Sequence, residues 1–204
     1  SMTALKDLME ISGGATYESR LDGAEFDASE RCGYLFNTGI ENIENADAIL
    51  LVGTNPRAEA AMINARIRKT YLRKRLPIAL IGQDSDLTYP YEHLGDGPAD
   101  LEKLLKARSG FAKTLKDAEN PVIIIGMAAF QRRDAKAVHA LCRKVAEKFD
   151  MVRGDWNGFN VLHDAASRVA ALDIGYHNKT AIDLQAQEFV YLLGADFDMD
   201  ALSD

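Results

Sequence analysis

The chain has 204 residues, 47% of them hydrophobic and 27% charged, so it can bury a core as one or at most two domains. Its formal charge of −7, from 24 basic and 31 acidic residues, argues against nucleic acid as the main partner. The longest apolar runs, 48–52 and 122–125, fall far short of the about 20 residues that cross a bilayer, so we expect no direct membrane insertion.

The beginning of the chain has the least regular pattern. Residues 4–11 show the apolar spacing of a helix, and residues 37–46 predict a short polar helix or turn. This segment leads into the first clear strand.

Four short apolar runs predict buried strands, because each is brief, rich in β-branched or aromatic residues and followed by glycine. Since every residue of each run is apolar, both faces of the sheet should be covered, which is typical of a parallel sheet between helices. The runs are 48–52, 78–81, 122–125 and 189–193, and they are followed by Gly53, Gly82, Gly126 and Gly194.

Segments with the helical period separate these runs. Residues 56–74 predict a helix in which Pro56 suits the first position and Asn55 the cap before it. Residues 134–149 predict another helix, whose apolar stripe contains Val138, Leu141, Cys142 and Val145.

Two more helical segments complete the pattern. A helix that begins at Pro98 should break near residues 109–110 and be followed by another over 111–118. A last helix is expected over 158–171, with Gly175 as a suitable terminator.

Strands that alternate with helices of this length form right-handed βαβ units. We therefore predict a single α/β domain over residues 1–204, Rossmann-like, with a mostly parallel sheet and helices on both faces. Residues 1–45 would be its less regular N-terminal part, and residues 46–194 its core of alternating strands and helices.

The segment ADAILLVGTNPRAEAAMINARIRK, residues 46–69, carries a resemblance to a known family. It resembles the molybdopterin-oxidoreductase fold as it occurs in the large iron–sulfur subunit of respiratory NADH:quinone oxidoreductase, or complex I. Further motifs follow in the same order along nearly the whole chain, at 81–82, 86–89, 93–96, 121–126, 162–176 and 192–196.

The resemblance implies a non-catalytic scaffold fragment of that subunit, whose parent complex passes electrons from NADH through iron–sulfur clusters to quinone. Its partners would be other subunits of the complex I peripheral arm, on the cytoplasmic side of the bacterial inner membrane or the mitochondrial matrix side. The [2Fe–2S] and [4Fe–4S] clusters would belong to a region outside this sequence. We accordingly expect no catalytic residue, no metal ligand and no cofactor here.

The loop Gly53, Thr54 and Asn55 is the candidate cofactor site. In molybdenum enzymes of this fold the corresponding loop helps to hold the pterin nucleotide, and a glycine before a helix N-terminus suits phosphate. The same residues also suit a tight turn and a helix cap, and the loop lacks the GxGxxG and GK[ST] patterns. We interpret the loop as vestigial; the alternative is an oxidoreductase domain that retains molybdopterin or a nucleotide at the strand ends, and a third possibility is a free-standing binding module.

Few other residues suggest chemistry. Cys32 and Cys142 have no second cysteine nearby, and His139 beside Cys142 on one helix gives two ligands, which do not close a metal site. His163 and Ser167 could share a face of the helix expected over 158–171, but a nucleophilic serine needs a strained turn, so no catalytic role is predicted.

One strongly basic cluster lies at the end of the helix expected over 56–74. It is explained either by a solvated helix end whose cations complement the helix dipole or by a docking surface for an acidic partner subunit. Its members are Arg66, Arg68, Lys69, Arg73, Lys74 and Arg75.

Overall fold

Contacts between residues group the chain into two compact units, residues 1–23 with 165–204, and residues 24–164. The prediction of a single domain over 1–204 stays a prediction. The computed structural model describes residues 1–13, 16–20, 22–25, 27–108, 110–178, 182 and 186–194.

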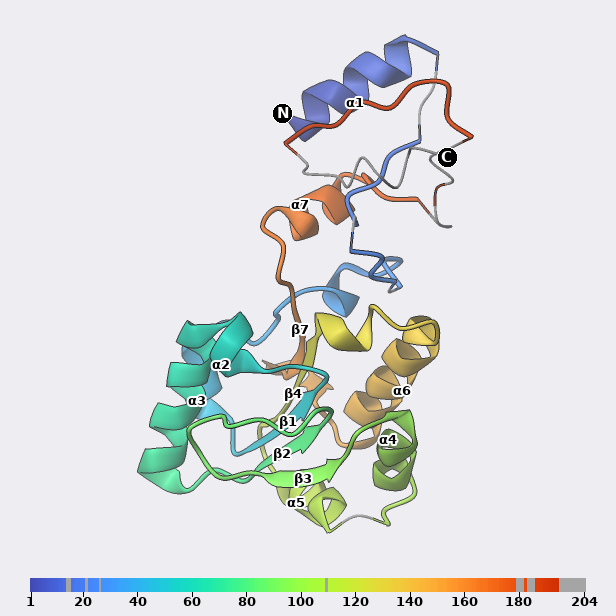
Figure 1. Ribbon diagram of the computed structural model, residues 1–204. Coiled ribbons are helices and arrows are strands. Elements are labelled where there is room, and N and C mark those ends of the chain that lie inside the picture. The colour runs from blue at the N-terminus through green and yellow to red at the C-terminus, as the bar shows by residue number, and fades with distance from the viewer. Residues whose placement is uncertain are drawn as a thin grey trace. The chain divides into compact units, whose positions relative to one another are not determined.

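The larger unit is built on a five-stranded parallel sheet with the order β3-β2-β1-β4-β7 (Figure 1). All residues of β1, β2 and β4 are buried, which confirms the prediction of strands covered on both faces. The strands are β1 Ala48–Val52, β2 Ile78–Ile81, β3 Glu92–Gly95, β4 Pro121–Gly126 and β7 Phe159–Leu162.

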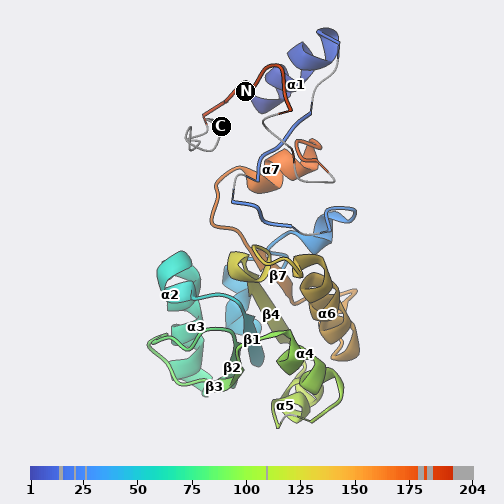
Figure 2. The same ribbon diagram turned by 45° about the vertical axis from the view of Figure 1, so that its right-hand side comes forward.

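Helices cover both faces of this sheet. Figure 2 shows α3 on one face, and α4 and α6 on the other. The predicted Rossmann-like arrangement is confirmed, and the break expected near residues 109–110 separates α4 from α5. The helices are α2 Pro56–Glu59, α3 Ala61–Lys74, α4 Pro98–Leu105, α5 Phe111–Asp117 and α6 Ala135–Lys148.

The helix predicted over 56–74 is two helices. Asn55 caps α2 and Pro56 is its first residue, as expected, but Ala60 leaves the helical conformation with φ −150° and ψ 71°. The short first helix therefore stands between the end of β1 and the longer α3, next to the loop that begins at Gly53.

The remaining elements are short. In the larger unit, β5 Val152–Arg153 pairs antiparallel with β6 Trp156–Asn157, and the 3-10 turns are η1 Arg31–Gly33, η2 Glu41–Asn45 and η3 Met127–Ala129. The smaller unit contains α1 Met2–Ile11 and α7 Arg168–Asp173, and the buried Arg168 lies 2.9 Å from the Asp22 carboxylate. The helix predicted over 4–11 and the turn predicted within 37–46 are both confirmed.

The helix predicted over 158–171 is wrong. Its first residues form β7, which pairs with β4, and α7 begins only at Arg168. Asn160 explains the error, because this polar residue interrupts the apolar run yet is fully buried in the strand. Its side chain donates to Thr38 Oγ1 at 2.8 Å and to the Ile123 carbonyl at 3.3 Å, contacts that only the fold supplies.

The strand predicted over 189–193 is also wrong. These residues form no strand, and Phe189 is 70% exposed. The alternation of strands and helices in the sheet ends with β7, so apolar composition without a partner strand did not produce a strand here. Of the helices in the described ranges, none combines the length and apolar character that crossing a membrane requires.

Candidate functional site

The carboxyl ends of β1 and β4 lie at the point where the chain reverses its direction of travel across the sheet. Open α/β sheets bind ligands in the crevice at this point. A crevice of about 140 Å³ is present, lined among others by Gly53, Gly82, Ala129 and Arg132. Ligand pockets for cofactors are usually about 300–1,000 Å³. The crevice is therefore smaller than an ordinary cofactor pocket.

Gly53 is the first residue of the predicted vestigial loop. Ala129 fills the space next to its Cα. A Cβ on Gly53 would lie 2.9 Å from the Ala129 backbone nitrogen, and the residue has φ +55°. Its N–H donates to the Ile81 carbonyl at 2.8 Å. Glycine is needed here because the turn η3 packs directly against the loop.

Thr54 and Asn55 donate to a carboxylate of their own chain. The Thr54 hydroxyl donates to Glu59 Oε2 at 2.7 Å, and the Asn55 N–H donates to Glu59 Oε1 at 2.8 Å. Asn55 Oδ1 in turn accepts from the Ala58 N–H at 3.4 Å, a long contact. The donors that would face a phosphate at this helix start are thus directed at the Glu59 carboxylate.

Glu59 is a residue of the site that was not predicted from the sequence. A signal was available, because an acidic residue in the first turn of a helix that follows Thr and Asn is typical of capping by a side-chain carboxylate. The residue stands one position later than in the usual capping box, which hides the pattern.

Charged groups at the mouth of the crevice are also paired with one another. Arg132 donates from Nε to Asp134 Oδ1 at 2.7 Å, and this bond lowers the pKa of Asp134. His93 Nε2 lies 2.8 Å from the Gly82 carbonyl and 3.3 Å from Asp96 Oδ1. The carbonyl contact, and then the Asp96 charge, raise the pKa of His93. Arg132 and His93 are thus each paired with a carboxylate.

His139 and Cys142 do share a face of α6, and both are buried. Burial raises the pKa of the Cys142 thiol to about 12, so it is not a nucleophile at neutral pH. His139 Nδ1 accepts from the Asp27 N–H at 3.2 Å, and Nε2 lies 3.0 Å from the Gly33 carbonyl, to which it donates. His139 therefore holds neighbouring backbone in place, whereas Cys32 is exposed.

His163 and Ser167 do not share a helix, so this prediction is wrong. His163 follows β7 with Nε2 2.7 Å from the Tyr34 carbonyl, and Ser167 precedes α7 with φ +67°. Within the described part of the chain, no three His, Cys, Asp or Glu side chains gather in a way that could hold a metal ion.

An all-parallel, doubly covered sheet with a glycine loop at the switch point defines a Rossmann-like α/β protein. The family model of molybdopterin oxidoreductases matches residues 1–201, and the chain belongs to this family.

The resemblance to the large iron–sulfur subunit of complex I is confirmed. The chain is 44% identical over 205 aligned positions to the mitochondrial NADH dehydrogenase (ubiquinone) iron–sulfur protein 1 of Solanum tuberosum, covering 100% of the chain and 28% of that protein. It is 42% identical to the 78 kDa subunit of NADH-ubiquinone oxidoreductase of Candida albicans, over 96% of the chain and 27% of the relative. It is 38% identical to a subunit of the NADH-quinone oxidoreductase of Rickettsia bellii, over 96% of the chain and 29% of the relative. The chain thus spans less than a third of the length of these relatives.

Proposed function

We propose that this chain is a non-catalytic scaffold region of the large iron–sulfur subunit of an NADH:quinone oxidoreductase. The parent complex would pass electrons from NADH through iron–sulfur clusters to quinone. The chain itself would bind no prosthetic group, and the clusters would sit in another region of the subunit. The names of three relatives that are 38–44% identical support the assignment to this subunit.

The assignment to this subunit also implies partners and a location. The neighbours would be other subunits in the peripheral arm of a membrane complex, on the cytoplasmic side in bacteria or the matrix side in mitochondria. A sheet that is buried on both faces gives the rigid body that such a role requires.

One observation carries the non-catalytic part of the proposal. The Glu59 carboxylate accepts the hydrogen bonds of Thr54 and Asn55 that an anionic cofactor would need. Ala129 lies against Gly53, where the backbone would have to approach a phosphate. A pterin nucleotide therefore does not fit these residues.

The test is made in the assembled complex. Thr54→Val removes a hydroxyl from the loop, and Thr114→Val, on α5 and away from the crevice, is the matched control. If the loop is only structural, NADH:quinone activity per assembled complex stays at the wild-type value for both variants, even where Thr54→Val lowers the amount of complex formed.

Loss of activity in fully assembled Thr54→Val complex, with the Thr114→Val complex unaffected, would contradict the scaffold role. So would stoichiometric molybdenum or pterin in the purified chain, measured by metal analysis and mass spectrometry. Either result would favour a retained ligand at the strand ends.

A further inference from the structure

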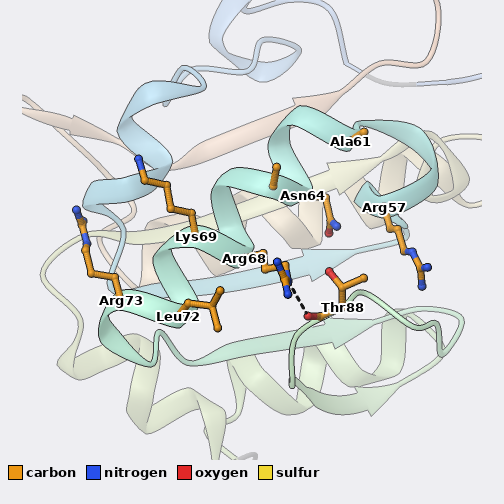
Figure 3. A pocket seen from close by; sticks show the side chains of 9 residues that line it. Arg57, Ala61, Asn64, Arg68, Lys69, Leu72, Arg73 and Thr88 are labelled. Carbon is orange, nitrogen blue, oxygen red and sulfur yellow. Dashed lines mark hydrogen bonds between the residues drawn. The ribbon is translucent and has the colours of Figure 1, made fainter.

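A second concave region lies apart from the strand-end crevice, along the outer side of α3. It is an open groove of about 680 Å³ between this helix and the loop that carries Thr88 (Figure 3). We call it the α3 groove and define it by its lining residues. They are Arg57, Ala61, Asn64, Ala65, Arg68, Lys69, Leu72, Arg73 and Thr88.

The α3 groove carries more positive charge than its carboxylates balance. Glu44 faces three cations, with Lys69 Nζ at 2.9 Å, Arg73 Nη1 at 3.9 Å and Arg66 closer still. Hydrogen bonds from Lys69 and Arg66 lower the pKa of Glu44. Among the described residues, the Glu44 carboxylate thus pairs with three cations, which leaves an excess of positive charge in this region. The chain as a whole has a net charge of −7.

Arg68 is the clearest source of that excess. Its Nε donates to the Thr88 carbonyl at 3.4 Å, and no carboxylate of the described residues lies within ion-pair distance of it. Arg57, at the other end of the groove, pairs with Asp86. The helix dipole stabilises cations only in the last turn, so it accounts for Arg73 but not for Arg68 in the middle of α3.

Asn64 adds an independent observation. The residue is only 7% exposed, and its Oδ1 is buried without a hydrogen-bond partner. Its side chain is directed toward the Thr88 loop at the groove (Figure 3). A buried acceptor without a donor destabilises a protein, so it marks a place where a donor from outside can be accommodated.

The lining between the cations is apolar. Ala61, Ala65 and Leu72 follow one another along one side of α3, and Leu72 is 57% exposed. Phosphate groups of nucleic acids or lipids offer acceptors and no donors, and would leave Asn64 Oδ1 unsatisfied. A peptide offers N–H donors, apolar side chains and carboxylates together.

We propose that the α3 groove binds an acidic amphipathic peptide segment of a partner protein. Its carboxylates pair with Arg68, Lys69 and Arg73. An apolar side chain covers Ala65 and Leu72, and an N–H group donates to Asn64 Oδ1. This binding is inferred from the residues of the groove alone and is independent of the proposed scaffold function.

The first experiment measures peptide binding to the full chain by fluorescence anisotropy. The probe is a labelled helical peptide of about 18 residues, which spans about 27 Å, with leucines along one face and glutamates on the other. A peptide with the same leucines and with lysines in place of the glutamates is the control probe. Saturable binding of the acidic peptide alone is expected, and it should weaken as salt is raised.

Two variants with the same change in charge separate the groove from the general surface. Arg68→Glu with Arg73→Glu should weaken binding of the acidic peptide about tenfold or more, because each reversal replaces attraction by repulsion. Lys113→Glu with Lys116→Glu, on the exposed side of α5, should change it less than about twofold. Equal loss in both variants would overturn the proposal, since it would show nonspecific charge attraction.

Asn64→Leu keeps the four heavy atoms and the branched shape of the side chain and removes the buried acceptor. The variant should raise the melting temperature of the free chain. It should also weaken the binding of the acidic peptide several-fold. A purely structural Asn64 would give a lower melting temperature with unchanged binding, which would overturn its assignment to the site.

Other occupants are outcomes of the same assay. Absence of saturable binding by the acidic peptide, or tighter binding of a DNA duplex or of vesicles rich in phosphatidylglycerol that depends on Arg68 and Arg73, overturns the proposal. Finding molybdenum or pterin in the chain would contradict the scaffold function and leave these binding results unchanged, so the two failures can be told apart.

Discussion

The strand-end crevice and the α3 groove differ in whether their polar groups have partners within the protein. At the crevice, Thr54 and Asn55 donate to Glu59, and Arg132 is held by Asp134. In the groove, Asn64 Oδ1 has no partner within the described ranges, and cations outnumber carboxylates. A site whose donors and acceptors satisfy one another contributes to stability, whereas one that leaves them unsatisfied is suited to a ligand. Substitutions should therefore lower stability at the crevice and lower binding at the groove.

The largest effect on stability is expected at Gly126, the last residue of β4. A Cβ on Gly126 would lie 2.4 Å from the Gly53 carbonyl oxygen and 2.9 Å from Thr54 Cα, and backbone cannot move aside as a side chain can. Gly126→Ala should destabilise the chain by about 3 kcal/mol, the upper range for overpacking. Urea unfolding measures the change.

Gly154→Ala is the matched control, because a Cβ there meets nothing within 4 Å. Its effect should stay within about 0.5 kcal/mol. Equal stability of the two variants would show that β4 and the Gly53 loop are not in contact as described.

A smaller loss is expected when the internal bonds of the crevice are removed. Thr54 is buried, and Thr54→Val deletes the hydroxyl that donates to Glu59. The cost should be about 1 kcal/mol, that of one hydrogen bond. The double variant Thr54→Val with Glu59→Ala should cost less than the sum of the single changes, which a double-mutant cycle in urea would reveal; full additivity would contradict the bond.

His139 offers a pH-dependent test in a region that is internally satisfied like the crevice. Burial lowers the pKa of His139 below its ordinary 6.5, and nearby Arg143 lowers it further, while the Gly33 carbonyl and Asp27 oppose the shift. The unfolded chain then binds more protons than the folded one between the lowered pKa and 6.5. Stability should fall as pH decreases through this window.

Denaturation at a series of pH values checks this prediction. His139→Asn should flatten the curve between the two pKa values, even though the variant is less stable overall. A wild-type curve with no slope in this window would contradict the neutral, doubly hydrogen-bonded His139.

The smallest effect on stability is expected in the α3 groove. Arg68→Glu with Arg73→Glu should change the free energy of unfolding by no more than about 0.5 kcal/mol, as for exposed residues in general. The same urea measurements apply. A loss comparable with that of Gly126→Ala would mean that the cations are part of the fold, and would remove the contrast between the two regions.

The central strands could be predicted from sequence because β1, β2 and β4 are apolar along their buried runs. The edges of the sheet could not. β3 is Glu-His-Leu-Gly and lacks an apolar run, while β7 contains Asn160, whose burial depends on Thr38, 122 positions away. Residues 189–193 have the composition of a strand and no partner to pair with, which local sequence cannot reveal.

The two sites were predictable to different degrees. The sequence indicated the Gly53 loop and the basic cluster, since glycine before a helix and clustered charge are local features. It could not indicate that Glu59 turns back onto the loop, that Ala129 packs on Gly53, or that Asn64 lacks a donor, because these depend on side-chain placement in the folded chain.

The scaffold proposal requires that the chain's own residues fill the place where relatives with a cofactor would bind one. Native mass spectrometry of the 204-residue chain, purified without denaturation after incubation with a guanine nucleotide and molybdate, tests it most directly. The expected result is the mass of the polypeptide alone. A stoichiometric adduct of nucleotide or molybdenum on the wild-type chain would contradict it.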